Sequence, residues 1–252
     1  MTQNQVGLIT TLLLGIFILL GALIALTVKR KQKIVDFSIG LAFGVITTLL
    51  LTDLLPETFE ALGLRKIYLF LIFSILGFTF LKVLDSFIPD HHDHKMNKKE
   101  SNENLVHIGI VTTIALVLHN IIEGMAVYSI ALSDSSLALA LSIGVGFHNI
   151  PLGMVIMSSF YQSNNDKKKS IISIGLVSIS TFVGGLIMYL FKLTSVNEMA
   201  LGIMLSVTLG MLIYIIIDEL LPRMMHSKGR ETSIWGAAAG IILVVLSVFF
   251  GG

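Results

Sequence analysis

The sequence lacks cysteine and carries little charge. None of the 252 residues is a cysteine, and only 13% are aspartate, glutamate, lysine or arginine. The absence of cysteine excludes disulfide bonds and thiolate metal ligands. Soluble globular proteins carry about 25% charged residues. Because this chain has half that share and is 54% hydrophobic, we predict an integral membrane protein.

Two further absences exclude other classes of protein. The formal net charge is only +1, so no nucleic-acid partner is expected. No GxxxxGK[ST] motif occurs, so ATP-driven pumping by this chain is not expected. The first apolar segment follows residues 1–5, which carry no basic side chain. That start is typical of a permanent helix, whereas a cleaved signal peptide begins with basic residues.

Eight apolar stretches are long enough to cross a membrane, for which a helix needs about 20 residues. We therefore predict an all-α protein with a single transmembrane domain over residues 1–252. The expected helices are 6–28, 36–60, 66–88, 105–132, 136–160, 170–192, 198–222 and 233–251. The one long connection, 89–104, is hydrophilic and contains histidine.

The basic residues predict the orientation. Thirteen of the 17 lysines and arginines fall in the first, third, fifth and seventh connections. Basic loops stay on the cytoplasmic side. We therefore expect a multi-pass protein of the cell membrane, surrounded by lipid, with these odd-numbered connections in the cytoplasm and both termini outside.

A repeated heptapeptide contains the most informative polar residues. Residues 119–125 read HNIIEGM and residues 148–154 read HNIPLGM, and the two agree at five of seven positions. Each lies in the middle of an apolar stretch. Polar side chains are costly in hydrocarbon, so those at mid-depth usually face a partner, water or a substrate path.

A second, weaker repeat links the second and seventh expected helices. An acidic-Leu-Leu-Pro element occupies 53–56 and 219–222, and each copy begins nine residues after a glycine, Gly44 or Gly210. The two helices run in opposite directions. This pattern favours a 3+2+3 arrangement, in which helices 1–3 and 6–8 form an inverted repeat around helices 4 and 5.

The heptapeptides supply metal-binding side chains. His119 and Glu123 are four residues apart and thus project from one face of a helix. His148 is expected at similar depth on the facing helix. Imidazole nitrogen and carboxylate oxygen both bind zinc and similar divalent ions. Asn120 and Asn149 are expected to bind the ion weakly or to orient the other ligands.

Further polar groups lie toward the membrane surfaces. Asp53 and Glu57 are one helical turn apart at the outer end of the second helix, and they could gather cations at an entrance. Three histidines of the long connection and two carboxylates of the seventh helix could serve an exit. The alternative is that these are interfacial or solvated side chains without a role in transport. The exit candidates are Asp218, Glu219, His91, His92 and His94.

At this point the chain resembles the ZIP (Zrt/Irt-like) family of divalent-metal transporters, bacterial type. The resemblance covers all eight expected helices, the histidine-bearing third connection and the two heptapeptides. It implies uptake of zinc, or of iron, manganese or a related ion, toward the cytoplasm. By motif match the metal ligands would be His119, Asn120, Glu123, His148 and Asn149. The ion would be the transported substrate, and no cofactor is expected.

One departure from the family pattern affects the site. Family members usually carry a ligand such as glutamate four residues after the helix-5 histidine, where this chain has Leu152, and the sixth stretch contains no acidic residue. We therefore expect one principal metal site rather than two. The alternatives are a metal-binding sensor or transport-impaired member and, less favoured because HExxH is absent, an intramembrane metal-dependent hydrolase. A homodimer is among the assemblies that the sequence allows.

Overall fold

The computed structural model describes residues 1–27, 31–87, 98–162 and 167–251, and every regular element in these ranges is helical. In chain order the elements are α1 (Gln3–Thr27), α2 (Lys31–Leu49), η1 (Leu50–Leu54), α3 (Leu55–Leu62), η2 (Leu64–Lys66), α4 (Ile67–Ser86), α5 (Lys98–Ser133), α6 (Ser135–Gln162), α7 (Lys167–Leu190), α8 (Glu198–Tyr214), η3 (Ile215–Leu220), α9 (Leu221–His226) and α10 (Arg230–Gly251). They include eight apolar spans long enough to cross a membrane. The predicted all-α membrane fold is thus confirmed.

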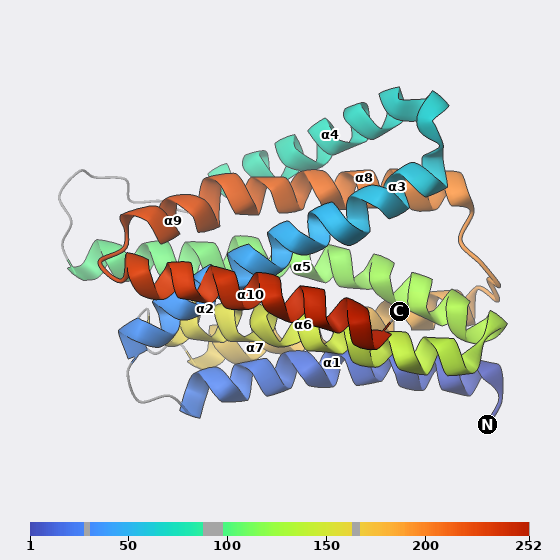
Figure 1. Cartoon of the computed structure of the whole chain (residues 1–252), viewed down its shortest axis with the longest axis horizontal. Helices are drawn as coiled ribbons and strands as arrows, with labels where there is room; N and C mark the ends of the chain where they lie inside the picture. The colour runs from blue at the N-terminus through green and yellow to red at the C-terminus, as the bar shows by residue number, and fades with distance from the viewer. Residues whose placement is uncertain (28–30, 88–97, 163–166, 252) are drawn as a thin grey trace.

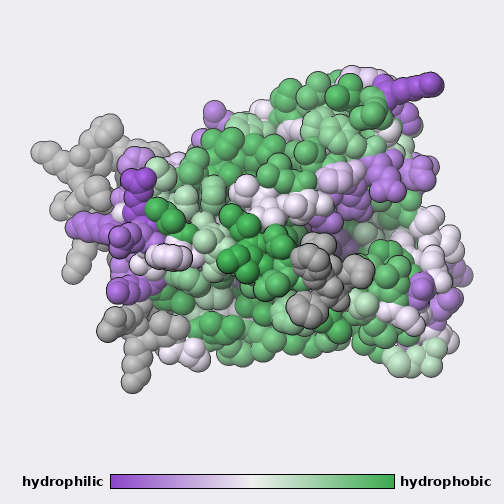
Figure 2. Space-filling model, in the orientation of Figure 1, coloured by the Kyte–Doolittle hydropathy of each residue, from purple (hydrophilic) through white to green (hydrophobic). Residues whose placement is uncertain are grey.

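The surface is apolar along the middle of the bundle. Figure 2 shows hydrophobic side chains over the middle and hydrophilic ones gathered at both ends. The helix α4 is the most exposed span, and side chains such as Leu71, Ile75 and Phe80 are at least half exposed. Such a band is what a lipid environment requires, because hydrocarbon offers no partner for polar groups.

The helix ends alternate between the two ends of the bundle. At one end lie the C-terminal ends of α1, α4 and α6, and the connection from α9 to α10 (Figure 1). At the other end lie the N-terminus and the connections from α3 to α4, α5 to α6 and α7 to α8. The odd-numbered connections therefore share one end. Among the described residues, α5 begins at Lys98.

The two helices that carry the heptapeptides lie at the centre of the bundle. Helix α6 packs against α1, α2, α7 and α10, and α5 packs against α1, α7 and α8. The two also contact each other. Each central helix therefore touches spans from both ends of the sequence.

Glycines let the central helices approach their neighbours closely. The heptapeptide glycine Gly124 faces the backbone carbonyl of Thr181 in α7, and its counterpart Gly153 faces the carbonyl of Ile18 in α1. A Cβ at either position would overlap that carbonyl oxygen. Small residues at such places allow tight packing between membrane helices. In both copies of the heptapeptide the glycine thus packs against a backbone carbonyl of a neighbouring helix, which is α7 for one copy and α1 for the other.

Two spans are interrupted by π-helical turns at matched positions. The N–H of Leu55 donates to the carbonyl of Leu50, and that of Leu221 donates to the carbonyl of Ile216, both five residues back. A proline lies two residues after the end of each turn, at Pro56 and Pro222. Proline has no N–H, and its ring clashes with the carbonyl four residues earlier, which favours the wider turn. These π-turns occur in both copies of the acidic-Leu-Leu-Pro element.

Candidate functional site

The predicted ligands of the heptapeptides meet between α5 and α6. Glu123 Oε1 lies 3.4 Å from His148 Nε2 and 3.9 Å from His119 Nε2. Both histidines are buried, and the Glu123 side chain is only 12% exposed. Because charged and polar groups at such depth need partners, one carboxylate oxygen shared by two imidazoles is the electrostatic centre of this site.

The two asparagines are completely buried beside these ligands. Asn120 donates from Nδ2 to the carbonyl of Val177 in α7 at 3.3 Å. Asn149 lies beside Glu123. Within the described part of the chain, several buried atoms here make no hydrogen bond: His119 Nδ1, Asn120 Oδ1, Glu123 Oε2 and both amide atoms of Asn149. Buried polar atoms are usually satisfied, so these atoms are suited to an ion or to water.

Two uncharged residues, Leu152 and Thr181, lie on the helices that pack against α5. Leu152 is only 1% exposed and belongs to the main hydrophobic core. In α7 the residue facing Gly124 is Thr181, whose hydroxyl is buried and makes no hydrogen bond within the described residues. Glu123 is thus the one carboxylate that the central helices α5, α6 and α7 place at this level. This geometry is consistent with one principal ion.

The entrance candidates lie in the π-turn η1 and the start of α3. Asp53 is exposed and interacts electrostatically with His148, Glu123 and His119. Glu57, one turn further, interacts with Asp53, Glu123 and Glu60. Figure 2 shows hydrophilic side chains along this part of the surface. The three carboxylates therefore form an acidic line from the end of α3 toward Glu123, and the sequence reasoning had omitted its outermost member, Glu60.

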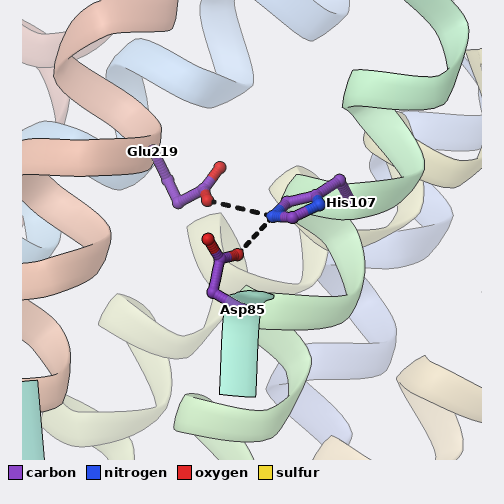
Figure 3. A group of neighbouring side chains, drawn as sticks. All are labelled: Asp85, His107 and Glu219. Atoms are coloured by element: carbon purple, nitrogen blue, oxygen red, sulfur yellow. Dashed lines mark hydrogen bonds and ion pairs between the residues drawn. The ribbon is translucent and has the colours of Figure 1, made fainter. Parts of the chain in front are cut away.

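The exit candidates separate in the structure. The side chain of Glu219 is 10% exposed and faces the interior, whereas Asp218 is exposed. His91, His92 and His94 lie outside the described residues. Glu219 lies instead beside two residues that sequence reasoning had not placed in a site, Asp85 of α4 and His107 of α5 (Figure 3).

This second group has the tighter ligand geometry of the two. Among the described residues it is the one group of three imidazole or carboxylate side chains whose ligand atoms all lie within 4.8 Å of one another. Asp85 ends the third apolar stretch and His107 begins the fourth. Their common depth was the signal available in the sequence, but nothing in it specified that Glu219 joins them.

Comparisons with known proteins identify the family to which the chain belongs. The chain is similar to "Zinc transporter ZupT" of Clostridium perfringens, with 28% identity over 275 residues that cover 98% of this chain and 96% of that protein. Proteins of the same name from Streptococcus mutans and Enterobacter sp. are 27% and 25% identical, each over at least 95% of both chains. The family model described as "ZIP Zinc transporter" matches residues 89–248. Because this match covers more than half of the sequence, the chain belongs to the ZIP family of zinc transporters.

Proposed function

We propose that this protein carries divalent metal ions, zinc foremost, across the membrane toward the cytoplasm through the site of His119, Glu123 and His148. One observation carries the proposal: two imidazoles from two central helices lie within 4 Å of the same buried carboxylate oxygen. Three protein ligands leave coordination positions open. An ion held in this way can be released again, as transport requires.

The comparisons support the same substrate. The three relatives described above are named zinc transporters, and the donors of this site are imidazole nitrogen and carboxylate oxygen, both of which bind zinc in proteins. Iron and manganese remain alternative substrates, because they accept the same donors. The family consists of transporters, so the expectation that the chain is not an enzyme is confirmed and the hydrolase reading is set aside. Zinc is then the substrate and not a cofactor.

The acidic line along α3 is suited to deliver the ion. Glu57 interacts electrostatically with both Glu60 and Asp53. Glu57 and Asp53 also interact with Glu123. Like-charged groups raise the local concentration of counter-ions. We infer that ions enter along this line and leave at the basic end of the bundle. The decisive test is saturable zinc entry into liposomes that contain the purified protein.

The proposed orientation predicts the accessibility of introduced cysteines. The chain has no native cysteine, so single substitutions report one position each. Ser195→Cys, between α7 and α8, should react with a membrane-impermeant maleimide in intact cells. Lys228→Cys, between α9 and α10, should react only after permeabilisation, because basic connections stay inside. Labelling of Lys228→Cys in intact cells, and of Ser195→Cys only after permeabilisation, would contradict the proposed orientation. The end of α3 would then face the cytoplasm, and ions could not enter there from outside.

Leu152 favours one further candidate, a family member that binds metal without moving it efficiently. Its side chain belongs to the core. It therefore offers no metal ligand at a position where members of the ZIP family usually carry one. The Leu152→Glu variant should raise zinc affinity if the new carboxylate reaches the site, by about tenfold or 1.4 kcal/mol. Measuring zinc affinity and transport together distinguishes the candidates. A gain from no transport to transport would identify the natural protein as impaired.

A further inference from the structure

The starts of α2 and α10 lie side by side, because the two helices run parallel and pack closely. A Cβ at Gly40 of α2 would overlap the carbonyl oxygen of Ser233 in α10. Four residues earlier in both segments, a Cβ at Gly229 would overlap the carboxylate of Asp36. The register is therefore the same along both helices, and their N-terminal ends reach the same level of the bundle.

Three exposed basic side chains gather at this level. They are Lys33 of α2, Lys228 just before α10, and Arg230 at the first residue of α10. The shared register places them within about one helical turn of one another along the helix axes. Among the residues that the structure describes, none of the three side chains forms an ion pair or a hydrogen bond. The neighbouring Glu231 is also exposed, and the group keeps a net positive charge.

The side of α10 that faces away from the bundle is apolar beyond these charges. The helix packs against α2, α6 and α9, and its outward side chains Ile234, Trp235, Ile241 and Ile242 are exposed. Trp235 is 73% exposed and is the only tryptophan of the chain. Tryptophan is enriched where a membrane meets water. Figure 2 shows hydrophilic atoms at the end of the bundle where α10 begins and hydrophobic atoms along the middle.

The spacing of these residues matches the layers of one membrane leaflet. Trp235 lies five residues after Arg230, about 7 Å deeper at a rise of 1.5 Å per residue. The headgroup layer of a leaflet is about 5–7 Å thick. Ile241 and Ile242 lie about 17 Å from Arg230, at the depth of the acyl chains. A lipid whose phosphate lies beside Arg230 therefore has its acyl chains beside the apolar side of α10.

We propose that the starts of α2 and α10 bind an anionic phospholipid. Lys33, Lys228 and Arg230 surround its negative headgroup, Trp235 packs at the lower boundary of the headgroup, and the isoleucines line the acyl chains. A zwitterionic phospholipid fits less well, because its own cationic group neutralises the phosphate. Each basic side chain near an anionic membrane surface strengthens binding by up to about fivefold. The binding does not rest on the proposed function; the leaflet does, since the basic connections predict the cytoplasmic one.

The fluorescence of Trp235 tests the proposal, because no other tryptophan contributes. The full-length protein is placed in nanodiscs of phosphatidylcholine in which a small fraction of the lipid carries bromine on its acyl chains. Bromine quenches tryptophan fluorescence on contact. Brominated phosphatidylglycerol should quench Trp235 at a mole fraction about tenfold lower than brominated phosphatidylcholine does. High salt should remove this preference, because it screens exposed charges.

Charge-removing variants locate the preference on this surface. Lys33→Gln, Lys228→Gln and Arg230→Gln should each reduce the preference for phosphatidylglycerol about two- to fivefold, and the triple variant should show none. Lys168→Gln is the matched control, because it removes an exposed lysine at the start of α7 and should keep the full preference. Quenching by brominated phosphatidylcholine should be the same in all variants, which controls for folding.

Four results would overturn the proposal. Two of them are equal quenching by both lipids in the unchanged protein, and full preference in the triple variant. If excess soluble glycerol phosphate abolishes the preference, the surface binds free anions and not a lipid. If neither brominated lipid quenches Trp235, another protein chain covers this side of α10. Zinc entry does not enter this measurement, so a failure of lipid binding and a failure of transport are recognised separately.

Discussion

Zinc entry into liposomes that contain the Glu123→Ala variant is expected to fall to the level of protein-free liposomes. Glu123 supplies the one carboxylate oxygen that approaches both His119 and His148. Without it two imidazoles remain with no anionic partner on the central helices. A dication in a low-dielectric interior needs such a charge, so the barrier to passage should rise by several kcal/mol.

The measurement is the initial rate of fluorescence from a zinc dye trapped inside the liposomes. His148→Ala should show the same loss, since it removes a ligand from the facing helix. Glu231→Ala is the matched control, because it removes an exposed carboxylate at the start of α10 and should transport as the unchanged protein does. Full zinc entry through both Glu123→Ala and His148→Ala would show that ions take another route.

The Gly124→Ala variant is expected to lose about 3 kcal/mol of stability, although it adds a single methyl group. The new Cβ would overlap the carbonyl oxygen of Thr181, which belongs to the backbone of α7 and cannot rotate away. The helices α5 and α7 must then move apart. Since Gly124 follows Glu123 directly, the shift should also weaken metal binding at the central site.

The thermal unfolding midpoint of the purified protein, followed by size-exclusion chromatography, measures this effect. Gly153→Ala should behave similarly, because its Cβ would overlap the carbonyl oxygen of Ile18 in α1. Gly175→Ala in α7 is the control, since no atom of a neighbouring helix lies within 4 Å of the added Cβ and alanine favours helix by about 1 kcal/mol. Equal midpoints for Gly124→Ala and Gly175→Ala would show that the tight α5–α7 contact is not needed.

These two predictions differ in how far the sequence anticipated them. Glu123 and the histidines were predicted as ligands from the sequence, because side chains four residues apart on one helix and a repeated heptapeptide are local patterns. The contact of Gly124 with Thr181 joins residues that are far apart along the chain. No local pattern specifies which turn of α7 lies against which turn of α5.

The acidic-Leu-Leu-Pro elements show the same limit more sharply. Their spacing predicted related positions in two spans, and the proline indicated an irregular helix. The π-turns themselves were not predicted, because the choice between a kink and a wider turn depends on the surrounding packing. Glu219 lies in the resulting π-turn, 3.5 Å from His107. The sequence predicted Asp218 and Glu219 as a pair of exit residues. It therefore did not predict the group of Asp85, His107 and Glu219.

The sequence by itself determined the eight apolar spans, the polar residues at their mid-depth and the resemblance to the family. Each of these depends on hydrophobic length or on spacing within one helix. Only the tertiary structure decided that one oxygen of Glu123 serves two imidazoles, and that Asp85, His107 and Glu219 converge. Those outcomes depend on how each helix is rotated and seated against its neighbours, which glycine contacts and π-turns fix across long stretches of chain.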